Sequence, residues 1–141
     1  MKRRNHSAFT LVEILIVVVI LGILAAIAIL GFAGATSDAQ ASTTASELQK
    51  IRRHIGVFQA RNTQHLPSVT PGDGTWGEII GRDYLLSPPT NAWVGNGNGK
   101  VIVFGTVPDT AYQNEYGWIY NPTTGDVYAG GFDINDKPLP R

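Results

Sequence analysis

The stretch "FTLVEILIVVVILGILAAIAIL" (Phe9–Leu30) is apolar almost throughout, but it carries a glutamate, Glu13, close to its start. The next charged residue is Asp38, so residues 14–37 form an uncharged run. As a helix rising about 1.5 Å per residue, this run would be roughly 36 Å long, enough to cross a hydrocarbon core of about 30 Å. The stretch therefore predicts a membrane-length helix. It also raises the question of what offsets the cost of a carboxylate at the rim of a membrane.

The composition limits the size and the chemistry of the rest of the chain. Its 141 residues suit one modest domain besides the apolar stretch. Lys+Arg and Asp+Glu are both 11, and without Lys2, Arg3 and Arg4 the balance is 8 basic against 11 acidic residues. Neither balance favours nucleic acid, which usually binds to a basic face. The absence of cysteine excludes disulfides and thiolate metal sites.

The N-terminus fits two plain interpretations. Residues 1–8 are short, polar and basic, and such a flank stays in the cytoplasm, so a simple membrane anchor would place the remainder of the chain outside. Alternatively, the segment is a secretory signal peptide in which residues 33–35, Ala-Gly-Ala, form the cleavage site. Against the second interpretation, the apolar stretch is longer than the usual 7–15 residues of a signal peptide.

A third interpretation comes from the order of the features between Ala8 and Ile29. A short basic leader ends in the small residue Ala8, Phe9 follows, and Glu13 precedes the apolar run. This order resembles the prepilin family, which comprises the type IV pilins and the pseudopilins of type II secretion systems. The resemblance implies that a prepilin peptidase cuts between Ala8 and Phe9 and that the new amino terminus is methylated. The family usually has Gly before the cut and often has Pro at the position of Leu30, so this chain departs from the pattern at both places.

The resemblance also implies a role for Glu13. In the family, this glutamate neutralises the amino-terminal charge of a neighbouring subunit during assembly. An unpaired carboxylate and an unpaired ammonium are both costly in lipid, and pairing relieves both. Phe9 and Glu13 are four residues apart, which on a helix places them on one face. We name Ala8 and Phe9 as processing residues and Phe9 and Glu13 as assembly residues. The alternative is an interfacial glutamate favoured by the helix dipole.

The segment after the apolar stretch predicts a continuation of the same helix. Apolar residues recur there at spacings of three and four, which marks one face of an amphipathic helix; they are Ala41, Ala45, Leu48, Ile51, Ile55 and Phe58. From Thr10 to Arg61 such a helix would be about 78 Å long. A small head cannot bury all of it. The first half must therefore find lipid or other copies of itself, as in a helical homo-oligomeric filament.

The remaining sequence predicts a small sheet. Three segments alternate aromatic and β-branched residues between turn-rich stretches, as in an antiparallel meander; they are Val101–Thr106, Glu115–Tyr120 and Asp126–Gly130. The predicted fold class is α+β, with a long N-terminal helix packed on an antiparallel sheet. The predicted organisation is a leader (1–8), a transmembrane and filament-core helix (9–36) and a soluble head (37–141).

One loop offers metal ligands, and no catalytic arrangement is evident. In "FDINDK" (Phe132–Lys137), oxygen ligands of the kind that calcium accepts lie close together at Asp133, Asn135 and Asp136. Major pseudopilins bind calcium in a C-terminal loop, so the resemblance implies calcium there, but the spacing is not that of an EF-hand and Asx-rich turns also form for backbone reasons. The histidines are scattered and predict no Ser–His–Asp arrangement; they are His6, His54 and His65.

The sequence thus predicts a pilin-like filament subunit that is not an enzyme. The expected location is the bacterial inner membrane, with the head outside the cytoplasm, and then a periplasmic or cell-surface filament. The expected partners are other copies of the chain, the prepilin peptidase and the inner-membrane assembly machinery. The alternative function is a membrane-anchored or secreted binding domain with a signal-peptide-like start. The sequence leaves open the choice between a type IV pilus and a type II secretion pseudopilus.

Overall fold

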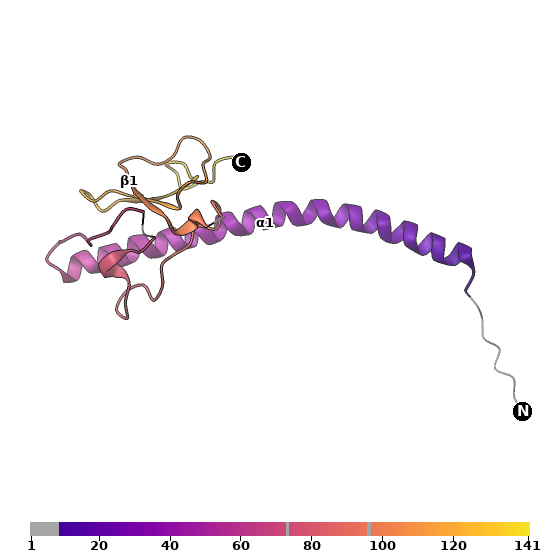
Figure 1. Ribbon diagram of the computed structural model, residues 1–141, viewed down its shortest axis with the longest axis horizontal. Helices are drawn as coiled ribbons and strands as arrows, with labels where there is room; N and C mark the ends of the chain where they lie inside the picture. The colour runs from indigo at the N-terminus through magenta and orange to yellow at the C-terminus, as the bar shows by residue number, and fades with distance from the viewer. Residues whose placement is uncertain (1–8, 73, 96) are drawn as a thin grey trace, which may run out of the picture. The chain divides into compact units, whose positions relative to one another are not determined.

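The computed structural model describes residues 9–72, 74–95 and 97–141, and within 29–33 it describes the backbone only. One long α-helix precedes two short 3-10 helices and three short strands. In chain order these are α1 (Leu11–Arg61), η1 (Gly77–Ile79), η2 (Asn98–Lys100), β1 (Ile102–Phe104), β2 (Trp118–Tyr120) and β3 (Val127–Ala129). The chain divides into two compact units between Thr36 and Ser37. This is the predicted α+β layout (Figure 1).

Helix α1 is continuous from the apolar stretch to Arg61, as predicted. It ends where the backbone turns left-handed, with φ of 53° at Thr63 and 66° at Gln64. The Gln64 N–H donates to the carbonyl of Gln59 at 2.8 Å, so that a terminal carbonyl of the helix is satisfied by the chain that leaves it. The helix therefore stops because of its own capping contacts, ahead of Pro67.

The three predicted strands all form, and they make one sheet in the order β1-β2-β3. Strand β2 lies in the centre, where Trp118 faces Ile102 of β1 and Ala129 of β3. β2 and β3 are antiparallel, as expected for two strands joined by a short turn. β1 and β2, however, are parallel. The sheet is therefore mixed, and the prediction of an entirely antiparallel meander is wrong for this pair.

The parallel pairing follows from the segment that joins β1 to β2. A parallel pair needs a crossover of about a dozen residues or more, and residues 105–117 are long enough to provide it. This crossover is tied back to the head by Asp109. Its carboxylate accepts hydrogen bonds from the Tyr116 hydroxyl at 2.6 Å and from the Gly131 N–H at 2.7 Å. These two hydrogen bonds hold the crossover against the segment that follows β3.

The core of the head lies between the C-terminal part of α1 and the sheet (Figure 1). The predicted apolar face of α1 is buried through Leu48, Ile51, Ile55 and Phe58. Trp76 fills the space beyond this face, edge-on to the rings of Trp118 and Tyr120 at centroid distances of 6.4 and 5.8 Å. These three aromatic side chains therefore form part of the buried core of the head.

A buried asparagine, Asn91, links the segments of the head. It is completely buried, and its side chain makes two donated and three accepted hydrogen bonds between 2.8 and 3.1 Å. The partners are the carbonyls of Gly117 and Gly130, the hydroxyl of Thr44 and the N–H groups of Trp93 and Val94. Since a buried polar group is costly unless it is satisfied, this network holds α1, the crossover and the sheet in one arrangement.

Candidate functional site

Glu13 is held at the start of α1 by Thr10. Thr10 immediately precedes the helix and Glu13 is its third residue, so the two form the reciprocal pair known as a capping box. Oε2 of Glu13 accepts hydrogen bonds from the Thr10 backbone N–H at 2.8 Å and from its hydroxyl at 2.9 Å. The Glu13 N–H donates in return to Oγ1 of Thr10 at 3.2 Å. The carboxylate therefore has partners within its own chain, before any neighbouring subunit is considered.

Phe9 lies just outside α1. The helix begins at Leu11 because Thr10 takes the capping position. The expectation that Phe9 and Glu13 share one helical face is therefore not met, since it requires Phe9 to be helical. The Phe9 side chain is exposed. Ala8 and the rest of the leader lie outside the described residues, and the processing and assembly roles of Ala8, Phe9 and Glu13 stay predictions.

The first part of α1 has an apolar surface that the chain itself does not cover. Among the described residues, Leu11–Ala28 is the window with the length and composition of a membrane span. Every side chain from Phe9 to Ala28 is exposed, and Glu13 is the charged one among them. Burying apolar surface is the main favourable term in association. This segment is therefore suited to lipid or to a bundle of similar helices.

The calcium candidates lie in a closed loop, where they already have partners. Oδ1 of Asp133 accepts the N–H groups of Asn135 and Lys137, both at 2.9 Å. The hydrogen bond from the Lys137 N–H is the largest cause that lowers the pKa of Asp133 below its usual range; desolvation opposes it, and the bond from Asn135 adds a smaller lowering effect. Both carboxylate oxygens of Asp136 face the guanidinium of Arg52. Both carboxylates thus already have partners within the chain, which a calcium ion would have to displace, and calcium binding stays a prediction.

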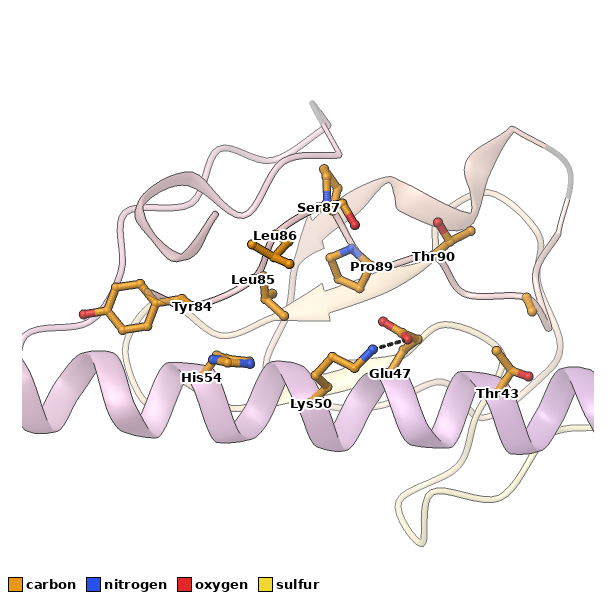
Figure 2. Close-up of a pocket in the computed structure, with 12 residues that line it drawn as sticks. Thr43, Glu47, Lys50, His54, Tyr84, Leu85, Leu86, Ser87, Pro89 and Thr90 are labelled. Atoms are coloured by element: carbon orange, nitrogen blue, oxygen red, sulfur yellow. Dashed lines mark hydrogen bonds and ion pairs between the residues drawn. The ribbon is translucent and has the colours of Figure 1, made fainter. Parts of the chain in front are cut away.

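A groove of about 600 Å³ lies between α1 and residues 84–92 (Figure 2). Glu47 and Lys50 form an ion pair at 2.5 Å along its helical side, and His54 lies further along the same helix. Among the described residues, no hydrogen bond connects Ser87 with His54, although both line the groove. The groove therefore presents no nucleophile held by a base, and its polar side chains are those of a solvated helix face.

The chain is similar to known proteins both in its N-terminal segment and along most of its length. Residues 3–29 match the family described as the prokaryotic N-terminal methylation motif. The chain is 29% identical over 135 residues to type II secretion system core protein G of Pseudomonas aeruginosa, covering 94% of this chain and 88% of that protein. It is 28% identical over 92 residues to core protein G of Aeromonas hydrophila, covering 65% and 57% of the two chains. No solved structure matches the chain.

A capped apolar helix with one carboxylate at its start, followed by a small α+β head, defines a pilin-like filament subunit. The N-terminal methylation motif of residues 3–29 and the similarity to core protein G over 94% of the chain agree with the pilin-like filament subunit that the sequence predicts.

Three residues that matter in the structure were not singled out from the sequence. Thr10 had a visible signal, because the spacing Thr-x-x-Glu before an apolar run is that of a capping box. Arg52 had no such signal, since its partners are 75 and 84 residues away along the chain. Asn91 resembles an ordinary loop asparagine in the sequence, and only the fold reveals its burial.

Proposed function

We propose that this chain is a subunit of the pseudopilus of a type II secretion system. The observation that carries the proposal is the similarity to type II secretion system core protein G over 94% of the chain. That similarity includes the head, whereas the methylation motif is confined to residues 3–29 and belongs to pili and pseudopili alike. The head is the part in which subunits of different filaments would differ, so similarity there favours the pseudopilus.

The proposed maturation starts with cleavage before Phe9 by a prepilin peptidase, followed by methylation of the new amino group. The basic leader stays in the cytoplasm and the apolar part of α1 spans the inner membrane, so the head lies outside the cytoplasm. The assembly machinery in that membrane then moves the subunit into the growing filament. Support for this order comes from the position of the small residue Ala8 between a basic leader and Phe9.

The proposed mechanism is association rather than catalysis. The apolar half of α1 leaves lipid for a bundle of identical helices. Glu13 exchanges its local partner, Thr10, for the amino terminus of a neighbouring subunit. A carboxylate without a partner is costly in the membrane. The capping box lowers that cost before the subunit joins the filament. A positively charged partner then replaces Thr10, since pairing relieves the cost of an unpaired charge for both groups in lipid.

Two measurements test this proposal. The mass of the mature N-terminus should correspond to N-methyl-Phe9, and Ala8→Leu should leave a precursor that is heavier by the leader. A terminus at Met1 would indicate an uncut anchor, and one at Thr36 a secreted domain. Deletion of the chain in its host should then stop type II secretion of exoproteins while surface pili persist, and a plasmid copy should restore secretion. Loss of pili with intact secretion would assign the chain to a surface pilus instead.

A further inference from the structure

Arg52 donates hydrogen bonds to oxygen atoms of two separate segments of the head. Its Nε and Nη2 donate to the carbonyl of Val127, where β3 begins, at 3.0 and 2.8 Å. Its Nη1 and Nη2 donate to the two carboxylate oxygens of Asp136, at 2.5 and 3.0 Å. One side chain from the middle of α1 thus joins the helix, the sheet and the C-terminal loop.

The oxygens around Arg52 are of the kinds that calcium takes as ligands. Calcium accepts backbone carbonyls and carboxylates in monodentate or bidentate form, and the guanidinium here meets one carbonyl and both oxygens of one carboxylate. The planar fork of an arginine matches a carboxylate in two-bond geometry and keeps its charge at all physiological pH values. We propose that Arg52 takes the place of a metal ion in this loop, so that an internal cation closes the head and the fold does not depend on calcium.

The backbone of the loop is shaped for this contact. Asp136 has φ of 57°, in the left-handed region that Asp tolerates better than most residues. Its N–H donates to the carbonyl of Asp133 at 3.1 Å, and the Asp133 N–H donates to the carbonyl of Lys137 at 2.9 Å. The loop is therefore closed by its own hydrogen bonds. The Arg52 and Asp136 side chains are 32% and 28% exposed, which leaves their attraction less screened than that of a fully solvated pair.

A second arginine holds the far end of the same segment. Nη2 of Arg141 donates to Gln40 Oε1 at 2.8 Å and to the Trp93 carbonyl at 2.5 Å. Its guanidinium also lies 4.1 Å from the centroid of the Trp93 ring, a cation–π contact. Cations of the chain itself thus fix the C-terminal segment at two points. A divalent ion placed on Asp136 would have to displace Arg52 or lie against its like charge.

The test is the thermal unfolding of the full chain in detergent micelles, followed by tryptophan fluorescence. The three tryptophans of the chain, Trp76, Trp93 and Trp118, all lie in the head, so the signal reports the head alone. We expect the wild-type melting temperature to be the same, within about 1 °C, in EDTA and in millimolar calcium, because a ligand that does not bind the native state does not stabilise it.

Arg52→Met should lower that temperature by roughly 4–8 °C, because Asp136 and the Val127 carbonyl lose their partner. Arg52→Lys, which keeps the charge and loses the fork, should lower it by less. The matched control is Lys50→Met, which removes another cation of α1 whose side chain is more exposed than that of Arg52, 47% against 32%. We expect that control to shift the melting temperature by about 2 °C at most.

Asp136→Asn completes a double-mutant cycle. If the two groups act together, the melting temperature of the double variant should equal that of the less stable single variant, within about 2 °C. Two outcomes would overturn the proposal: a wild-type melting temperature that rises by more than about 4 °C with calcium, or additive effects of Arg52→Met and Asp136→Asn. If Arg52→Met does not fold, Arg52→Lys takes its place in the cycle with Asp136→Asn, and the calcium titration of the wild-type chain is unaffected.

Discussion

The two halves of α1 deal with apolar surface in opposite ways. In the first half, the described side chains up to Ala28 are all exposed within the single chain. In the second half, Leu48, Ile51 and Ile55 are buried by the chain's own head. Both halves are helical, so helix formation alone does not say where stabilisation comes from. The second half is stabilised by tertiary packing within the chain, whereas the described side chains of the first half have no such packing to stabilise them.

The charged residues of the two halves also differ in where their hydrogen-bond partners come from. Glu13 is satisfied by Thr10, three residues before it, and a contact this local can be exchanged without disturbing the head. Arg52 is satisfied by Val127 and Asp136, which only the folded head brings to it. Substitutions in the first half should therefore change assembly and leave the head intact. Substitutions in the second half should change the stability of the head first.

The largest expected effect is that of Glu13→Gln on filament growth. Glutamine can keep the capping contact with Thr10, since a capping box accepts Glu or Gln, but it removes the charge. Losing one member of an ion pair that is buried on assembly leaves the other charge unpaired, and we expect a several-hundred-fold or greater loss of subunit affinity. Membrane insertion and cleavage should survive, because the span becomes more apolar.

The measurement compares filaments built from wild-type and Glu13→Gln subunits, and the melting temperature of the head serves as the internal control. The head temperature should not change, because Glu13 makes its described contacts with Thr10 alone. If Glu13→Gln subunits form normal filaments without wild-type subunits, Glu13 is not needed for assembly and is an interfacial charge instead. A lowered head temperature would contradict the separation between the two halves of α1.

The next largest effect is expected from Asn91→Ala in the head. The substitution removes the partner of the Gly130 carbonyl and of the Val94 N–H, both buried, whereas the Gly117 carbonyl keeps the Gly130 N–H and the Trp93 N–H keeps Thr44. Each unsatisfied buried group costs about 1–3 kcal/mol, so we expect a loss of about 2–6 kcal/mol in the free energy of unfolding. The matched control is Asn98→Ala, because Asn98 is exposed and its side chain donates to the Asn114 carbonyl at 2.8 Å. It should cost about 1 kcal/mol or less.

Urea unfolding of the two asparagine variants, followed by tryptophan fluorescence, measures the difference. Equal midpoints for Asn91→Ala and Asn98→Ala would mean that water or a rearranged loop replaces the buried amide. That result would remove Asn91 from the contacts that fix the head.

The sequence predicted the parts of the fold that depend on local pattern. The apolar spacing of Leu48, Ile51 and Ile55 fixes one buried face whatever the rest of the chain does, so this face was predicted correctly. The strands were located by their alternation, and each observed strand lies inside its predicted range. Strand direction was not predictable in this way, because alternation of residue types marks a strand and does not specify whether its neighbour is parallel or antiparallel.

The contacts of the candidate site were predictable where both residues are close in the sequence and not where they are far apart. The Thr10–Glu13 cap could be predicted, since both residues lie within one helical turn. The loop of Asp133 and Asp136 was found by composition, but the side chain that faces it could not be, because Arg52 comes from a different element. Long-range partners of charged residues are set by the packing of the head, and one sequence contains no direct record of them.

A smaller effect is expected from Thr10→Val, which removes the hydroxyl and keeps nearly the same shape. The Glu13 N–H loses its acceptor, and the loss of an N-terminal cap costs about 1 kcal/mol. At about 1.4 kcal/mol per factor of ten, hydrogen exchange of the Glu13 amide in micelles should become roughly five times faster. Thr10→Ser should exchange like the wild type. Equal rates for Val and Ser would show that the cap does not hold the start of α1.

The smallest effect at neutral pH is expected from Tyr116→Phe in the crossover. The Tyr116 hydroxyl donates to Oδ1 of Asp109 at 2.6 Å, and losing such a bond near the surface costs about 1 kcal/mol or less. The substitution should change the stability of the head more at alkaline pH. Burial, first, and then the hydrogen bond to Asp109 and the charges of Asp109 and Glu115 raise the pKa of Tyr116 above its ordinary value. Burial also raises the pKa of Tyr120.

The direction of the pH dependence follows from proton counting. The unfolded chain releases its phenol protons at about pH 10, while the folded head still holds those of Tyr116 and Tyr120. Their contribution to stability is therefore complete below about pH 10 and is lost as the pH rises above it. We expect the urea midpoint of the wild-type head to fall above about pH 10, and that of Tyr116→Phe to fall less steeply, since one of the two groups has been removed. Identical slopes for the two proteins would mean that the Asp109 contact does not hold the Tyr116 proton in the folded head.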